Sequence, residues 1–169
     1  MKIACLLAEQ FEDSEFQEPY ERFQLAGHVV TVIGTEAHQQ LTGEKGTVTT
    51  STDQAIGEVR PEDFGALFLP GGRSPEHLSG DQRVLGFVQE FMDHEKPVLA
   101  ICHGPELLLS AHRVDGRRMT ATPSVQGNLR AAGSEVVDEP AVVDRNLVTA
   151  RRPGDLPEFL AASLELIGA

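Results

Sequence analysis

The feature that most constrains the fold is the segment 96–106, in which a short apolar run stops abruptly at Cys-His-Gly-Pro. The run 98–101 is apolar and follows a proline, which is typical of a strand buried on both faces. The Gly-Pro-Glu sequence at 104–106 suits the first turn of a helix, because proline is tolerated there and an acid complements the helix dipole. Cys102 is therefore predicted to sit on a sharp turn between a strand and a helix.

A cysteine in this position is typical of a nucleophile elbow, here with Cys in place of Ser and Ala100 in place of the first glycine. The alternative is a buried structural cysteine at the end of a strand, and the His-Gly-Pro sequence that follows favours the elbow. A helix N-terminus lowers a thiol pKa from about 8.5 toward roughly 3.5–7.5, so Cys102 is expected to be a thiolate near neutral pH. His103 is expected to point away from Cys102 if the turn is sharp, yet it could serve as acid or base when a carboxylate orients it.

Strand-like and helix-like segments alternate along the chain, which predicts an α/β fold with a mostly parallel sheet and helices on both faces. A length of 169 residues suits a single domain spanning 1–169. Ser14 is the predicted cap of the first helix, where Pro19 suggests a kink or a late start, and Asp155 is the predicted cap of the last. A threonine-rich hairpin is expected over 41–50. The other expected strands are residues 2–8, 28–33, 66–69, 98–101, 118–122, 141–143 and 147–150, and the other expected helices are 84–94, 105–112 and 124–132.

Three loops, 9–15, 70–76 and 102–104, each follow a predicted buried strand. The carboxyl ends of parallel strands meet at one edge of a sheet, so these loops are expected to converge. Glu12 and Glu15 are then available to hydrogen-bond the thiol, and one of them is expected to be protonated or hydrogen-bonded. The Pro-Gly-Gly at 70–72 is either a plain tight turn or a turn that directs backbone N–H groups toward a developing negative charge.

Composition excludes several classes of function. The net charge of −12 argues against binding to a nucleic-acid backbone, and no apolar run approaches the roughly 20 residues of a membrane span. The N-terminal apolar run is too short and too soon followed by acids for a signal peptide, so a cytoplasmic location is expected. Cys5 is predicted to be an inert core residue. The spacing of Cys and His predicts no metal site, the glycines match no phosphate-binding loop, and no cofactor is expected.

The motifs Ala-Ile-Cys-His-Gly-Pro-Glu-Leu-Leu and Leu-Pro-Gly-Gly-Arg-Ser-Pro-Glu resemble the PfpI family of intracellular cysteine proteases, within the DJ-1/PfpI superfamily. Further likeness lies in residues 11–15, 42–43 and 142–157, so it extends over nearly the whole chain. The resemblance implies an α/β/α sandwich of the flavodoxin-like, class I glutamine amidotransferase-like kind.

By this resemblance Cys102 is the nucleophile, His103 its catalytic partner and Glu15 the acid that touches the thiol. Glu76 matches a carboxylate that reaches His103 of a neighbouring subunit, which implies a homo-oligomer, a dimer or a hexamer. Gly72 matches the oxyanion donor.

The backbone N–H of His103 is the second expected oxyanion donor, and Glu12, Gly71 and Thr122 are expected in the substrate pocket. The sequence departs from its relatives at Glu106, often Gln in the family, and at Thr122, where some relatives have Tyr. Both departures bear on substrate preference.

Three activities are compatible with this resemblance, because one fold hosts several chemistries. The favoured one is action on methylglyoxal or glyoxal, or on their adducts with proteins and nucleotides, in a stress-protective role. The second is hydrolysis of peptides through an acyl-enzyme on Cys102. The third is redox sensing without turnover, in which Cys102 is oxidised.

Overall fold

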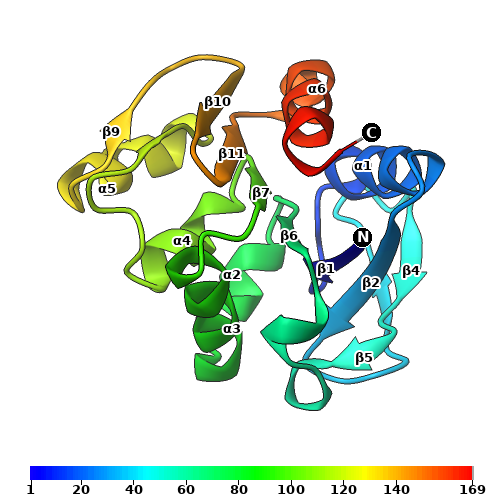
Figure 1. Ribbon diagram of the computed structural model, residues 1–169. Helices are drawn as coiled ribbons and strands as arrows, with labels where there is room; N and C mark the ends of the chain where they lie inside the picture. Colours follow the sequence, from blue (N-terminus) through cyan, green and yellow to red (C-terminus); the bar gives the residue numbers. More distant parts are fainter. Residues whose placement is uncertain (169) are drawn as a thin grey trace.

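The computed structural model describes residues 1–168 and is built around a seven-stranded sheet (Figure 1). The strand order is β10-β11-β7-β6-β1-β2-β5, and every neighbouring pair is parallel except β10 with β11. The strands are β1 (Lys2–Leu6), β2 (Val29–Gly34), β5 (Gln54–Ala55), β6 (Ala66–Leu69), β7 (Val98–Ile101), β10 (Ala141–Asp144) and β11 (Leu147–Ala150).

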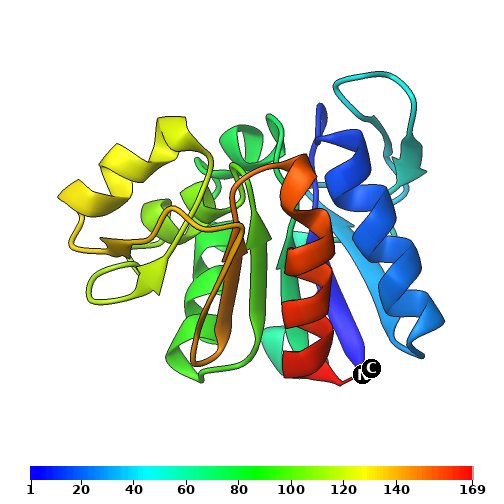
Figure 2. The ribbon, with the colours of Figure 1, turned by 90° about the horizontal axis from the view of Figure 1, so that it is seen from above.

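Helices cover both faces of this sheet (Figure 2). One face packs against α1 (Asp13–Leu25) and α6 (Leu156–Ile167). The other packs against α3 (Gln82–Asp93), α4 (Pro105–Ser110) and α5 (Pro123–Ala131), with the short α2 (Ser74–Leu78) beside α4. The fold is thus the mostly parallel α/β/α sandwich that the sequence predicts.

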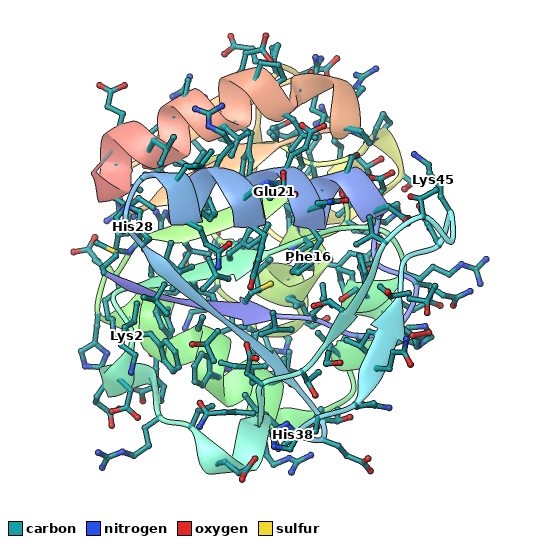
Figure 3. The ribbon with its side chains drawn as sticks, turned by 90° about the vertical axis from the view of Figure 1, so that its right-hand side faces the viewer. Lys2, Phe16, Glu21, His28, His38 and Lys45 are labelled. Carbon is teal, nitrogen blue, oxygen red and sulfur yellow. The ribbon has the colours of Figure 1, made fainter. Side chains whose placement is uncertain are left out.

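The central strands β6 and β7 are buried at every position, because helices cover both of their faces. Adjacent residues of a strand point to opposite faces, so Leu67 packs on the α3 side while Phe68 packs on the α1 and α6 side. Phe16 is on the buried side of α1 and contributes to the same core layer as Phe68 (Figure 3). Each face therefore has its own apolar core.

Two small sheets lie outside the main one. The predicted hairpin is present as β3 (Gln40–Thr42) and β4 (Thr49–Ser51). Lys45 lies in its turn, near the N-terminal end of α1 (Figure 3). The strand expected over 118–122 is only β8 (Arg118–Met119), which pairs with β9 (Glu135–Val136) and not with the main sheet. The predicted strand was too long because strand pairing ends at Met119, and the Thr122 N–H instead donates to the Cys102 carbonyl. Short 3₁₀ helices span Ile56–Glu58, Pro61–Asp63 and Pro153–Asp155.

Of the two predicted helix caps, the position of Asp155 is confirmed and that of Ser14 is wrong. Helix α1 begins at Asp13 and contains Pro19, and its capping side chain is Glu12, which accepts a hydrogen bond from the Glu15 N–H at 3.0 Å. Asp155 does occupy the position before α6, but its carboxylate makes no cap bond and accepts from Arg151 Nε at 2.9 Å. Each of these carboxylates is also paired with a cation, Glu12 with Lys45 and Asp155 with Arg151.

Within the part of the chain that the structure describes, no helix is both long enough and apolar enough to cross a membrane.

Candidate active site

The turn after β7 holds Cys102 in a strained backbone conformation. Its φ is +63°, in the left-handed region that non-glycine residues rarely adopt. The Cys102 N–H donates to the Ala150 carbonyl at 2.9 Å, and its carbonyl accepts from the Thr122 N–H at 3.0 Å. A Cβ on Gly104 would overlap the Leu69 carbonyl oxygen, so the next turn requires glycine. The sharp strand-to-helix turn predicted from the sequence is therefore present, with α4 beginning at Pro105.

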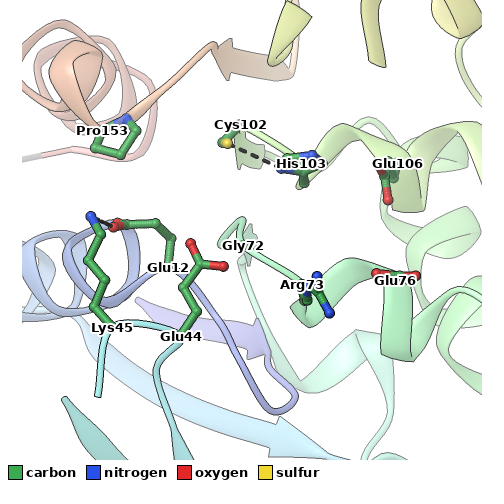
Figure 4. A pocket seen from close by; sticks show the side chains of 10 residues that line it. All are labelled: Glu12, Glu44, Lys45, Gly72, Arg73, Glu76, Cys102, His103, Glu106 and Pro153. Carbon is green, nitrogen blue, oxygen red and sulfur yellow. Dashed lines mark hydrogen bonds and ion pairs between the residues drawn. The ribbon is translucent and has the colours of Figure 1, made fainter. Parts of the chain in front are cut away.

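The thiol of Cys102 faces His103, contrary to the expectation that His103 points away. The distance from Cys102 Sγ to His103 Nδ1 is 3.4 Å (Figure 4). The two side chains thus lie on the same side of the elbow, where Cys102 has its left-handed φ. His103 is consequently placed to take the proton of the thiol.

The expected lowering of the Cys102 pKa is also wrong. Burial, and the negative charge of Glu15 whenever that carboxyl is ionised, raise the pKa of Cys102 to about 12. Hydrogen bonds from the Thr122 side chain and the Gly72 N–H act in the opposite direction. The thiol is 8% exposed, and α4 is only six residues long, so loss of hydration outweighs the helix dipole. Activation of the thiol thus needs a proton acceptor close by.

Glu15 is a fully buried acid beside the thiol. Burial, together with the negative charges of Glu12 and Glu44, raises the pKa of Glu15 to about 8. Hydrogen bonds from Cys102 and the Gly71 N–H lower this pKa, but by less. Its Oε1 accepts from the Gly71 N–H at 3.1 Å, whereas Oε2 lacks a partner of good hydrogen-bond geometry. Glu15 is consequently protonated at neutral pH, as the sequence argument requires of one of the two glutamates.

Glu12 stays ionised because it is paired. Burial alone would raise its pKa, but hydrogen bonds from Lys45, the Ser14 hydroxyl and the Glu15 N–H hold that pKa below its ordinary value. Lys45 Nζ lies 2.5 Å from Glu12 Oε1 (Figure 4). The two neighbouring glutamates therefore differ in protonation, Glu12 as a carboxylate and Glu15 as an acid.

Gly72 is a backbone donor to the Cys102 sulfur. Its φ is +74°, and a Cβ there would overlap the backbone of residues 10–12, so only glycine fits. The bridge that pairs Gly72 with Phe11 holds this turn against the end of β1. The N–H is thereby directed at the Cys102 sulfur, next to which a reacting oxygen would sit.

A pocket of about 590 Å³ opens over Cys102. Glu76 and Glu106 lie on its α2 and α4 side, and Glu12 and Lys45 lie opposite (Figure 4). Its lining residues are Glu12, Glu44, Lys45, Gly72, Arg73, Glu76, Cys102, His103, Glu106 and Pro153.

Gly71 and Thr122, expected in the pocket, are not among its lining residues. Gly71 is buried and donates its N–H to Glu15, and the half-buried Thr122 hydrogen-bonds the Cys102 thiol through its side chain. Glu76 lines the same pocket as His103 of its own chain. Burial and the negative charge of Glu76 raise the pKa of Glu106, while the interaction with His103 lowers it. The structure thus brings Glu12, Glu15, Gly72 and His103 together around Cys102, and places Glu76 at the rim.

Sequence reasoning missed Ser124, whose Oγ lies 3.5 Å from His103 Nε2. It also missed Asp13, which holds the β3–β4 turn. The Asp13 carboxylate accepts from the N–H groups of Lys45, Thr47 and Val48, each at 2.9 Å. The sequence does not show these roles, because Asp13 and Ser124 act on segments distant in the sequence. Among residues 1–168 no group of three or more His, Cys, Asp and Glu side chains is arranged to hold a metal ion.

A parallel α/β sheet with a strained cysteine at the carboxyl end of a central strand defines a class of α/β proteins with a cysteine elbow. Residues 1–166 match the DJ-1/PfpI family, and the chain belongs to that family.

Two relatives resemble almost the whole chain. It is 46% identical to "Protein/nucleic acid deglycase 2" of Escherichia coli, covering 99% of this chain and 98% of that protein. It is 45% identical to "General stress protein 18" of Bacillus subtilis, covering 98% and 97%.

Solved structures agree with the fold. A two-domain protein of Anabaena variabilis, with DJ-1/ThiJ/PfpI-like and ferritin-like domains, matches at a TM-score of 0.96 and 35% identity over 99% of this chain. The chain spans 48% of that protein's length. Drosophila melanogaster DJ-1beta matches at a TM-score of 0.89 and 26% identity, covering 99% of this chain and 91% of that one.

Proposed function

We propose that this protein is a cysteine-dependent hydrolase that acts on methylglyoxal or glyoxal, or on their adducts with proteins and nucleotides, in protection against carbonyl stress. The observation that carries the proposal is the 3.4 Å contact between Cys102 Sγ and His103 Nδ1 at a strained elbow under an open pocket. The similarity to a protein named for deglycase activity supports the choice of substrate.

The first step is addition of sulfur to the aldehyde carbon. His103 Nδ1 accepts the thiol proton, the C–S bond forms, and the carbonyl π electrons move to oxygen, which takes up a proton to give a hemithioacetal. The Gly72 N–H is near enough to the sulfur to donate to this oxygen. With an amine adduct, the sulfur replaces nitrogen at the same carbon and the amine leaves with a proton.

The second step is a proton shift between the two carbons that came from methylglyoxal. Glu15, with a pKa of about 8, is poised to exchange a proton at neutral pH. The shift converts the hemithioacetal into a thioester, with one carbon oxidised and its neighbour reduced. Water then cleaves the C–S bond, releasing lactate and restoring the Cys102 thiol.

The pocket supports an adduct as well as a free aldehyde. Its volume of about 590 Å³ lies in the range of small-molecule sites and holds a modified side chain or base in addition to the aldehyde carbons. Peptide hydrolysis through an acyl-enzyme on Cys102 is the second candidate, favoured by the same nucleophile and oxyanion donor. Redox sensing by Cys102 is the third.

One substrate panel separates these functions. Wild type, Cys102→Ala and the matched control Cys5→Ala are each incubated with methylglyoxal, with a glycated peptide and with unstructured peptides. We expect wild type and Cys5→Ala to form lactate and Cys102→Ala to match the uncatalysed rate. Cleavage of peptides with no consumption of methylglyoxal would replace the proposal with the peptidase. Neither activity, together with selective addition of oxygen to Cys102 by mild peroxide in mass spectrometry, would replace it with the sensor.

A further inference from the structure

The charge of the pocket over Cys102 is strongly unequal. Four carboxylates line it, those of Glu12, Glu44, Glu76 and Glu106, against the two cations Lys45 and Arg73. Lys45 is already paired with Glu12 at 2.5 Å. The remaining three carboxylates therefore face a single Arg side chain.

These charges act on residues beside Cys102. The negative charge of Glu44 contributes to the raised pKa of Glu15, which lies beside the Cys102 thiol. Glu106 interacts with the charge of His103 and with that of Glu76. Glu106 is also half-buried, which reduces the screening of its charge by water. Carboxylates on two different walls of the pocket thus lie near the residues that surround the nucleophile.

A pocket with this potential concentrates cations and repels anions, and the effect is strongest where walls of low polarity focus the field. A phosphate-bearing nucleotide brings at least one negative charge to the same space. A modified side chain flanked by Lys or Arg brings positive charge. The net charge of −12 for the whole chain acts in the same direction at longer range.

We propose that Glu44, Glu76 and Glu106 make this site selective for aldehyde adducts carried on basic polypeptide segments, over adducts on nucleotides or nucleic acid. The proposal rests on the proposed function, because it names the substrate class of the same nucleophile. Glu44 and Glu106 are specificity-determining residues in it, since they set the charge around the reacting carbon.

The potential can be measured without turnover, through the rate at which methanethiosulfonates modify Cys102. Each reagent forms a mixed disulfide with the sulfur and releases methanesulfinate, so cationic, neutral and anionic reagents differ chiefly in the charge they carry into the pocket. Division by the rates with a small free thiol removes intrinsic reactivity. We expect the cationic reagent to exceed the anionic one by about tenfold at low ionic strength, and the ratio to fall at high salt.

Variants assign the effect to residues. Glu44→Gln and Glu106→Gln should each lower the cation-to-anion ratio several-fold, whereas the matched control Glu18→Gln on the exposed face of α1 should leave it unchanged. Cys102→Ala shows that the label enters at Cys102. Equal rates for the two charged reagents, or ratios that ignore both pocket substitutions, would overturn the proposal.

A turnover arm tests the substrates themselves, by comparing kcat/KM for a glycated Lys- and Arg-rich peptide with that for glycated guanosine monophosphate. The peptide is expected to be preferred at low salt, and Glu44→Gln is expected to reduce the preference. Equal kcat/KM values would refute the charge selection while leaving the proposed function intact. No turnover of either adduct or of free methylglyoxal would refute the proposed function, and the methanethiosulfonate ratio would still report on the pocket.

Discussion

At the scale of single residues, Glu15 and Cys102 titrate as a coupled pair. Burial raises the pKa of both, to about 8 and about 12, and ionisation of one opposes ionisation of the other. Near neutral pH Glu15 therefore holds its proton and Cys102 is a thiol beside His103. Both the Glu15 carboxyl and the Cys102 thiol therefore carry a proton before a substrate binds.

Glu15 should make stability depend on pH. Its folded-state pKa of about 8 lies above its ordinary value of 4.5, so the folded chain keeps a proton that the unfolded chain loses. Unfolding then becomes more favourable as pH rises through that window. Glu15→Gln cannot ionise, and we expect its free energy of unfolding to exceed that of wild type by a margin that grows from pH 4.5 to 8. Each pK unit corresponds to about 1.4 kcal/mol, so the final margin is a few kcal/mol at most.

Urea denaturation at a series of pH values measures this margin, with Glu18→Gln as a control at an exposed site of the same helix. Parallel pH curves for Glu15→Gln and wild type would show that Glu15 ionises normally in the folded chain.

Ser124 should act as a positioning residue for His103, because its hydroxyl lies 3.5 Å from Nε2 while Nδ1 faces the thiol. We expect Ser124→Ala to lower kcat for methylglyoxal by about twofold to tenfold, the equivalent of one hydrogen bond, with KM nearly unchanged. The pH profile of kcat should shift as well, and Ser124→Thr should restore both. If Ser124→Ala keeps the wild-type kcat and profile, His103 is oriented by other contacts.

The sequence predicts Cys102 as the nucleophile because the strand, turn and helix signals around it are all local. It predicts neither the orientation of His103 nor the pKa of the thiol. Both depend on a left-handed φ and on burial by Thr122, Gly72 and Glu15, which reach the site from other parts of the chain. Local pattern identifies the candidate nucleophile, and tertiary packing determines its protonation.

At the scale of elements, the β3–β4 hairpin carries Glu44 and Lys45 to the pocket and is fastened by one side chain of α1. Asp13 accepts three backbone N–H groups and the Thr47 hydroxyl from its turn. The sequence predicts a hairpin from its threonines and its glycine turn. The sequence does not predict the hydrogen bonds from this turn to Asp13, because they join residues more than thirty positions apart.

Asp13→Asn should loosen this turn. An amide offers one oxygen where the carboxylate offers two, so part of the set of bonds to residues 45–48 is lost. We expect a loss of about 1–3 kcal/mol in the free energy of unfolding and a higher KM with a smaller change in kcat. Hydrogen exchange at Lys45, Thr47 and Val48 should quicken selectively. Asp63→Asn, at an exposed site, is the control, and uniform exchange changes in both variants would contradict a local role.

At the scale of the whole molecule, a mostly parallel sheet with helices on both faces follows from alternating strands and helices, and the sequence predicts it. The sequence predicts neither the order of the strands nor the pairing of β8 with β9, since so short a pair depends on its neighbours for stability. We propose, as the family resemblance implies, that the protein forms a homo-oligomer in which Glu76 reaches His103 of another subunit.

A solution mass tests that association. Light scattering should give a multiple of the 18.3 kDa chain, corresponding to a dimer or a hexamer. Glu76→Gln should then weaken association and activity together, because one carboxylate serves both. A fully active protein at the mass of one chain would refute the association, and Glu76 would act only within its own pocket.

The elbow has a consequence for how the protein is made. The Cys102 peptide is held by Thr122 on one side and by Ala150 of β11 on the other, and β11 is among the last strands synthesised. A chain emerging from the ribosome with Cys102 already exposed lacks both partners. Its thiol has neither the burial nor the strain of the finished site, so the reactive centre is assembled only when the last part of the chain folds into place.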